Sequence, residues 1–268
     1  MTEGPPRGLT FGSVAERYER YRPGYPDALL ALVVADVAVT TAIEIGAGTG
    51  KATRLVAGSG IDVTAVEPDP QMAAVLTRVT AGLPVTVVIS TLEELPEYPP
   101  VDLLYAAAAW HWTDRETRWE RAARLVRAGG LFASLGGPVN VADALLDARV
   151  EALREEVIGS EDIAGTEDEP DGLAWPGNEL LASPYFTDVE QHELTVTFPM
   201  AADDLVGLIS TVSAYLLLPE PTRDALLGRI RSVLPATVEV RRDLRLHRAR
   251  RTDVGVGQTG TSSTAPTA

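Results

Sequence analysis

A glycine-rich turn near residue 46 constrains the fold of this chain more than any other feature. Residues 43–50 read Ile-Glu-Ile-Gly-Ala-Gly-Thr-Gly, which predicts a short buried strand running into a turn, and residues 51–57 predict a helix. A second apolar run, 61–66, ends at Glu67, 17 residues after Gly50. A glycine-rich strand-to-helix turn followed by an acid at the tip of the next strand is typical of a βαβ unit that binds a nucleoside.

The spacing of the glycines excludes two common nucleotide sites. A dinucleotide fingerprint needs a third glycine where Lys51 stands, which disfavours an oxidoreductase that uses a nicotinamide cofactor. A P-loop needs glycine in place of Ile45 and Ser or Thr in place of Ala52. The remaining pattern, E-x-G-x-G-T-G, resembles motif I of class I methyltransferases that depend on S-adenosylmethionine (SAM).

Length and composition limit the possible partners. The chain has 268 residues, no cysteine and a net charge of −15. The lack of cysteine excludes a disulfide framework and a thiolate metal site, and we expect a cytoplasmic protein without a metal. The negative charge disfavours a nucleic-acid partner, and no apolar run reaches transmembrane length. We therefore expect no membrane or nucleic-acid partner, and a monomer or homodimer.

Strands and helices alternate along the first half of the chain, which predicts an α/β fold with a parallel sheet. The whole pattern predicts a Rossmann-like, doubly wound, seven-stranded sheet whose last strand is reversed, with a helical cap. The expected domains are an N-terminal helical lid over 1–37, a SAM-binding domain over 38–252 with cap helices around 200–234, and a disordered tail over 253–268. The expected strands are 41–45, 61–66, 85–89, 101–106, 131–135, 189–198 and 238–246, and the main expected helices are 27–37, 70–81, 114–127, 142–157, 203–214 and 221–234.

The resemblance to class I SAM methyltransferases extends over roughly residues 11–250. The matching segments are A-E-R-Y-E-R-Y-R-P-G-Y-P at 15–26, V-E-P-D with Met72 at 66–72, T-L-E-E-L-P at 91–96, A-A-A-W-H-W at 107–112 and L-V-R-A-G-G at 125–130. They resemble a small-molecule branch that includes enzymes like trans-aconitate methyltransferase and actinobacterial biosynthetic members. The resemblance implies SAM as cofactor, methyl transfer to a small-molecule acceptor, and a role in secondary metabolism. A protein that keeps the SAM fold for other chemistry, such as a cyclase or a SAM-binding accessory protein, is the alternative.

The resemblance also implies which residues form the site. The implied cofactor-binding residues are Tyr21, Arg22, Glu44, Gly46, Ala47, Gly48, Gly50, Glu67, Pro68, Met72, Thr91, Leu92 and Ala107, and the implied substrate pocket contains Tyr18, Tyr25, Trp110 and Trp112. Ala108 stands where relatives often carry Gln, which predicts a less polar acceptor pocket.

His111 is the candidate catalytic base, because it follows the fourth strand at the carboxyl edge of the sheet, where open α/β sheets bind ligands. A His-Trp pair that only braces the pocket wall is the alternative. Tyr21 and Arg22 form either a lid over the ligands or the surface of a packed helix. Residues 241–251 carry six arginines, for which an exposed strand or tail with solvated side chains is the expected structure.

Overall fold

The computed structural model describes residues 11–159 and 172–255. The first ten residues of the predicted lid and most of the predicted tail lie outside these ranges. The helices are η2 (Gly12–Val14), α1 (Ala15–Tyr21), α2 (Asp27–Val34), α3 (Lys51–Gly58), α4 (Pro70–Val79), η3 (Trp110–Trp112), α5 (Arg118–Leu125), α6 (Ala144–Ile158), α7 (Gly177–Ala182), α8 (Ala202–Ile209), α9 (Ser213–Leu216) and α10 (Glu220–Val233). The strands are β1 (Thr41–Ile45), β2 (Asp62–Val66), β3 (Val85–Val88), β4 (Val101–Ala107), β5 (Val126–Gly136), β6 (Val139–Val141), β7 (Phe186–Ala201) and β8 (Thr237–Arg251).

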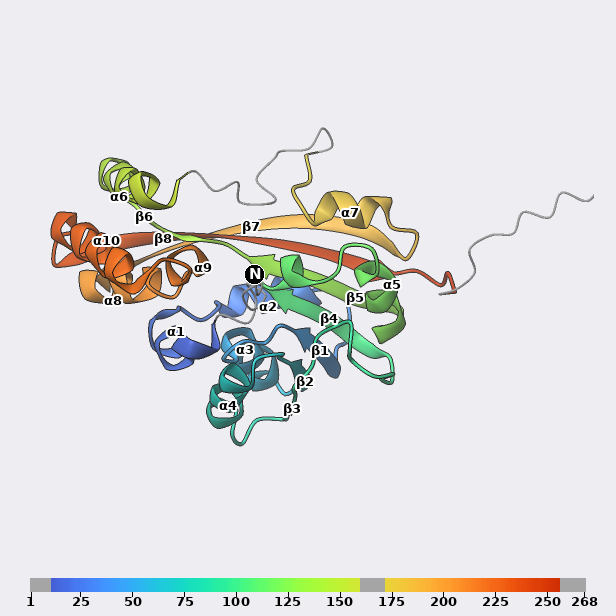
Figure 1. The fold of residues 1–268 in the computed structure, drawn as a ribbon. Helices are drawn as coiled ribbons and strands as arrows, with labels where there is room; N and C mark the ends of the chain where they lie inside the picture. The colour runs from blue at the N-terminus through green and yellow to red at the C-terminus, as the bar shows by residue number, and fades with distance from the viewer. Residues whose placement is uncertain (1–10, 160–171, 256–268) are drawn as a thin grey trace, which may run out of the picture.

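The strands form one sheet in the order β3-β2-β1-β4-β5-β8, and β7 pairs with the free side of β8 (Figure 1). Strands β1 to β5 are parallel, whereas β8 is antiparallel to β5 and to β7. This arrangement confirms the predicted doubly wound sheet with a reversed last strand. The short β6 is an addition to the prediction, and it pairs with β8 through Val139–Arg242 and Val141–Val240.

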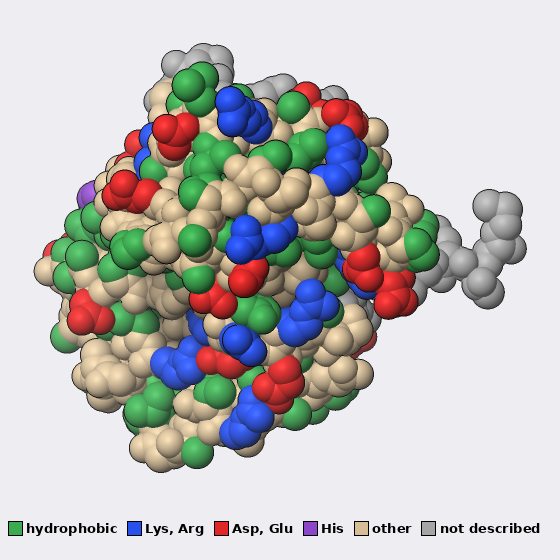
Figure 2. Space-filling model, turned by 90° about the vertical axis from the view of Figure 1, so that its left-hand side faces the viewer, with side chains coloured by type: hydrophobic (Ala, Val, Ile, Leu, Met, Phe, Trp, Pro, Cys, Tyr) green, Lys and Arg blue, Asp and Glu red, His purple; other side chains and the backbone are tan. Residues whose placement is uncertain are grey.

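Strands β7 and β8 form a long ribbon that reaches past the other strands, and α6, α8, α9 and α10 gather at its far end (Figure 1). These helices enclose a separate cluster of buried apolar side chains. The helix predicted over 203–214 is broken between α8 and α9. The hydroxyls of Ser210 and Thr211 donate to the carbonyls three residues earlier, which competes with helical pairing and ends α8. Acidic and basic side chains are interleaved over the face that carries these helices and α1 (Figure 2).

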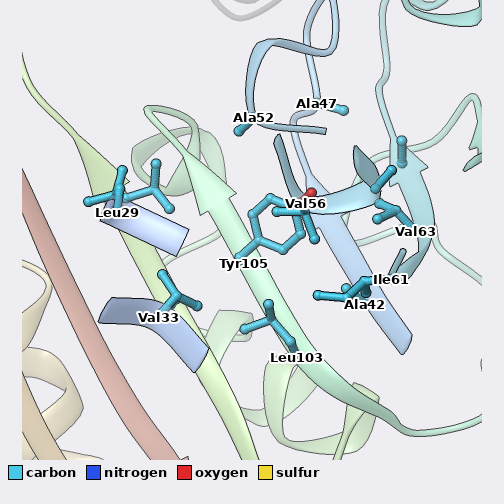
Figure 3. Close-up of a cluster of buried hydrophobic side chains, with 14 of the residues drawn as sticks. Leu29, Val33, Ala42, Ala47, Ala52, Val56, Ile61, Val63, Leu103 and Tyr105 are labelled. Atoms are coloured by element: carbon cyan, nitrogen blue, oxygen red, sulfur yellow. The ribbon is translucent and has the colours of Figure 1, made fainter. Parts of the chain in front are cut away.

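Strands β1 and β4 and the second half of β5 are buried on both faces, as their apolar sequences predict. On one face, Leu29 and Val33 of α2 pack toward Leu103 and Tyr105 of β4 (Figure 3). On the other face, Phe132 of β5 and its neighbours pack with the aromatic residues around α5. The two buried faces hold the sheet rigid, so that the loops at its carboxyl edge start from fixed positions.

The arginines of β8 correct one expectation. Arg242, Arg248 and Arg251 are buried, with 6%, 8% and 7% of their surface exposed. The prediction of solvated side chains was wrong for these three, because β8 lies inside the sheet between β5 and β7 rather than at an edge.

Candidate cofactor and acceptor site

The glycine turn after β1 requires glycine for its backbone and for its packing. Gly46, Gly48 and Gly50 have φ angles of +68°, +59° and +86°, a region that other residues rarely adopt. A Cβ atom on Gly46 would lie 2.4 Å from the Cβ of Ala109, and one on Gly50 would lie 2.6 Å from a methyl carbon of Leu76. The turn therefore brings its backbone close to the loop after β4 and to α4, and larger residues would force these elements apart.

Glu67 lies at the end of β2 with 5% of its surface exposed. Its Oε2 accepts a hydrogen bond from the backbone N–H of Gly48 at 2.7 Å, and its Oε1 accepts one from the backbone N–H of Asp69 at 2.9 Å. Burial raises the pKa of this carboxyl, while the two hydrogen bonds oppose the rise. Each carboxylate oxygen keeps a further lone pair, so the side chain can accept hydrogen bonds from a diol such as a ribose.

A cavity of about 140 Å³ lies beside Glu67 and the glycine turn. Its wall combines the ends of β1, β2 and β4 with the N-terminal segment. Ten residues implied by the resemblance line it: Tyr18, Gly46, Gly48, Glu67, Pro68, Met72, Thr91, Leu92, Ala107 and Trp112. The structure thus brings together the segments around residues 18, 46, 67, 91 and 107, which are far apart in the sequence.

Ala108, which the sequence analysis associated with the acceptor pocket, also lines the cavity. Six further residues line it that the sequence reasoning did not single out: Phe11, Ile45, Ser90, Glu93, Ala109 and Thr113. Most of them adjoin a recognised motif, so their proximity in the sequence could have indicated them. Phe11 gave no such signal. Its ring lies 6.0 Å from the ring of Tyr18 and 6.4 Å from that of Trp112, and these contacts exist only in the folded chain.

Glu44 does not line this cavity. Its Oε2 accepts hydrogen bonds from the hydroxyls of Thr53 at 2.5 Å and Tyr105 at 2.9 Å. Burial raises the pKa of the Glu44 carboxyl to about 8, because desolvation outweighs the two hydrogen bonds. Ala47 and Gly50, which belong to the turn itself, do not line the cavity either. Contact of these three residues with a cofactor stays a prediction.

Tyr21 and Arg22 join the N-terminal segment to the cap. The Tyr21 ring packs so closely on α8 that a Cβ atom on Gly207 would lie 2.7 Å from it. The Nε of Arg22 donates to the hydroxyl of Thr211 at 2.9 Å, and its guanidinium lies 5.0 Å from the centre of the Tyr18 ring. Neither residue lines the cavity, so their roles in binding stay predictions.

The side chains of the adjacent residues Trp110 and His111 lie in different environments. Trp110 is 1% exposed and packs with Trp119 and Phe132, at ring distances of 5.2 and 4.7 Å, so it belongs to the core. Solvent reaches His111, whose ring lies 4.5 Å from that of Trp112. The surrounding protein lowers the pKa of His111 by desolvation, which keeps the imidazole neutral near pH 7. Neither residue lines the cavity, and their predicted roles are untested, as is that of Tyr25.

Comparison with known proteins identifies the family. An uncharacterized methyltransferase of Mycobacterium tuberculosis is 34% identical to this chain over 230 residues, which cover 84% of this chain and 86% of the relative. The chain belongs to the class I SAM-dependent methyltransferases. The family model described as "Methyltransferase domain" matches residues 43–134 of this methyltransferase, from β1 into β5.

Solved structures show the same fold. A protein of Anaeromyxobacter dehalogenans, assigned as a type II methyltransferase, superposes with a TM-score of 0.64 at 23% identity, covering 86% of this chain and 98% of its own. Phosphoethanolamine N-methyltransferase 2 of Haemonchus contortus, in complex with phosphomonomethylethanolamine and S-adenosylhomocysteine, superposes with a TM-score of 0.54 at 16% identity, covering 90% of this chain and 58% of its own.

The cofactor of this methyltransferase is SAM, and its residues fit that cofactor. Glu67 offers two carboxylate oxygens that suit a diol such as a ribose, and the glycines of the turn lie beside them without side chains. Neither the nicotinamide-dependent alternative nor the non-methylating one gains support from the comparisons. In the part of the chain that the structure describes, none of the helices has the length and apolar character needed to cross a membrane.

Proposed function

We propose that this methyltransferase acts on a small-molecule acceptor. The aromatic side chains that cover the cavity are the main support for this proposal. Phe11, Tyr18 and Trp112 all line the cavity, and the ring of Phe11 contacts each of the other two rings edge to face. A cavity covered by Phe11 and Tyr18 of the N-terminal segment and by Trp112 of η3 suits a small acceptor that the protein encloses, whereas a polymer needs an open groove.

The charge of the protein supports the same class of acceptor. A net charge of −15 repels a phosphate backbone, and the face formed by α1 and the cap shows charges of both signs side by side (Figure 2). A role in secondary metabolism rests on the family resemblance alone, and a monomer or homodimer remains the expected state.

In this proposal the protein contributes binding and alignment. Bound SAM supplies an electrophilic methyl group. Glu67 holds the ribose, the turn from Gly46 to Gly50 follows the methionine part, and Thr91 and Leu92 lie along the adenine. The aromatic cover excludes water and orients the acceptor for an in-line displacement, in which alignment supplies much of the rate enhancement.

His111 is the proposed base for an acceptor that must lose a proton. Its position directly after β4 places it at the carboxyl edge of the sheet, and its neutral imidazole can accept a proton. An acceptor that reacts through an already ionised group would not need this residue.

The test combines binding and turnover. Calorimetric titration should show micromolar binding of SAM and S-adenosylhomocysteine and none of NAD. A panel of small molecules is then screened for release of S-adenosylhomocysteine, with RNA and protein substrates in parallel. Turnover of a small molecule supports the proposal, whereas turnover of only RNA or protein overturns it.

A further inference from the structure

Strand β7 forms an edge of the sheet along its whole length. Its residues, Phe186 to Ala201, pair with β8 on one side. Among the described residues, no strand and no backbone hydrogen bond occupies its other side. Helix α7 lies near one end of β7, and the cap helices lie near the other end (Figure 1). An unpaired edge of this length is a template on which another strand can pair.

The middle of this edge lacks the features with which proteins usually block such pairing. Residues 191–198 read Gln-His-Glu-Leu-Thr-Val-Thr-Phe, without proline or lysine, and Glu193 is their only acidic side chain. The blocking features lie on either side of this stretch. The strand has a bulge that includes Asp188, whose φ angle is +51°, and Pro199 has no N–H group to donate. The edge is therefore open to pairing between the bulge and Pro199.

The apolar side chains on one face of β7 are only partly covered. Leu194 packs with the core of the sheet, and Phe198 packs with the cap cluster, but both are half-buried. Their partners on β8, Leu244 and Val240, are fully buried, with 1% and 0% of their surface exposed. The difference arises because β8 has neighbouring strands on both sides and β7 has one on a single side. A further strand beside β7 would cover these side chains and stabilise them by burial.

The open stretch of β7 is complementary to a second copy of itself. In an antiparallel pair centred on Thr195, the two Thr195 side chains face each other, and Leu194 of each copy faces Val196 of the other. Glu193 of each copy faces Thr197 of the other, so no like charges meet, and Arg245 of β8 already pairs with Glu193 at 3.1 Å. Threonine pairs and aliphatic pairs are favourable cross-strand neighbours. Because opposite residues lie on the same face, the apolar rows of the two copies join on one side of the sheet.

We propose that two copies of this methyltransferase associate through the free edges of their β7 strands, in an antiparallel pair centred on Thr195 that joins the two sheets. The backbone groups of residues 192–198 supply the hydrogen bonds of this pair, as in other cases of strand addition. The interface is small, so we expect reversible association at micromolar protein concentrations. Strand β7 runs directly into α8, on which Tyr21 packs, so the pair also joins the caps of the two copies. The inference does not depend on the acceptor.

Two matched variants test the position of the interface by analytical ultracentrifugation over a range of protein concentrations. Thr197→Glu places a carboxylate opposite Glu193 of the other copy, twice in each dimer. Within its own chain position 197 pairs with Arg241, so the new charge does not oppose folding. Thr187→Glu is the control. Thr187 is also exposed and also pairs with an arginine of β8, Arg250, but it lies beyond the bulge and outside the proposed pair.

The expected result is a reversible equilibrium between monomer and dimer for the wild type and for Thr187→Glu. Thr197→Glu should raise the dissociation constant of the dimer about 10-fold or more, because like charges directly opposite each other are unfavourable. Adding Glu193→Gln to Thr197→Glu should restore most of the affinity, since residues 193 and 197 meet only in this register. A wild type that stays monomeric at every concentration, or a dimer that both glutamate variants weaken equally, would overturn the inference.

Hydrogen exchange of the wild type tests the same interface without any substitution. In residues 192–198, the amides that point away from β8 should exchange with deuterium more slowly as the protein concentration rises and the dimer forms. A dimer that leaves the exchange of these amides unchanged would associate through another surface, and the inference would be wrong. The melting temperature of each variant in dilute solution, where the protein is monomeric, shows whether the substitution affects the fold itself.

Discussion

The carboxylate of Glu19 in α1 lies 3.2 Å from the Nζ of Lys51, the only lysine of the chain, at the start of α3. The same carboxylate accepts a hydrogen bond from the hydroxyl of Thr49 at 2.7 Å and pairs with Arg54 at 2.8 Å. The side chains of Glu19 and Lys51 are only 16% and 14% exposed. One acidic side chain thus fastens the N-terminal segment to the glycine turn, and Tyr18 from that segment covers the cavity.

Glu19→Gln should loosen this attachment. We expect the free energy of unfolding to fall by about 1 kcal/mol, because the pairs are partly shielded from solvent. The amides of α1 should exchange faster with deuterium, and SAM should dissociate faster. Glu16→Gln is the control, since its pair with Arg78 is exposed. Unchanged exchange in α1 of Glu19→Gln would show that the N-terminal segment is held by its apolar contacts instead.

Glu67→Ala should weaken SAM binding by about 1.5–3 kcal/mol, since it removes charge-assisted hydrogen bonds to the ribose. Calorimetry measures the affinity, and circular dichroism checks the fold. Asp62→Asn serves as control, because this exposed acid lies at the opposite end of β2. Wild-type affinity in a folded Glu67→Ala protein would contradict the placement of the ribose.

The buried Glu44 predicts a dependence of stability on pH. Its folded pKa of about 8 is higher than the ordinary value of 4.5, so the folded state binds the proton more tightly than the unfolded state. Protonated Glu44 therefore contributes to the free energy of unfolding. This contribution is fully present below the unfolded pKa and is lost as the pH rises from about 4.5 to 8, at up to about 1.4 kcal/mol per pH unit. Urea denaturation should show this loss in the wild type and a flatter profile in Glu44→Gln. If the stability of the wild type and of Glu44→Gln changed with pH in the same way, Glu44 would not be the cause of the pH dependence.

Glu179 holds a buried cation in place. It pairs with Arg118, which is 1% exposed, and accepts hydrogen bonds from the indole N–H groups of Trp119 at 2.9 Å and Trp175 at 3.1 Å. Glu179→Ala leaves the guanidinium uncompensated and should lower the free energy of unfolding by about 3–5 kcal/mol. Chemical denaturation measures the loss. Glu120→Ala, which removes an exposed pair with Arg124, should change stability by no more than about 0.5 kcal/mol.

His111→Ala tests the proposed base once an acceptor is known. If His111 removes a proton, kcat should fall by about 10²- to 10⁴-fold while SAM affinity stays the same. In the wild type, kcat should also fall at acid pH, below the lowered pKa of the imidazole. The half-buried His192, which pairs with Glu190, is the control for substitution by alanine. A small change in kcat with an altered KM would instead indicate that His111 braces the pocket wall.

Local patterns predicted much of this molecule because they act over short distances. The apolar runs predicted strands β1 to β5 to within a few residues, apart from the start of β5, since a strand buried on both faces must be apolar throughout. The motifs around Gly46, Glu67, Thr91 and Ala107 all meet at the cavity, because parallel strands end at one edge of the sheet. Trp110 and Trp112 show the limit of such reasoning. The short helix η3 turns one indole into the core and the other toward the cavity.

The sequence by itself determined the fold class, the cofactor family and the residues at the carboxyl edge of the parallel strands. Only the tertiary structure decided how the N-terminal segment closes over them and which charges are buried. Phe11 reaches Trp112, Glu19 reaches Lys51 and Arg242 reaches Gly24 across long stretches of chain. These contacts depend on how separate elements pack. The six arginines of residues 241–251 look alike in sequence, and only their neighbours in space distinguish Arg242, which among the described residues has no acidic partner and no acceptor for its Nε.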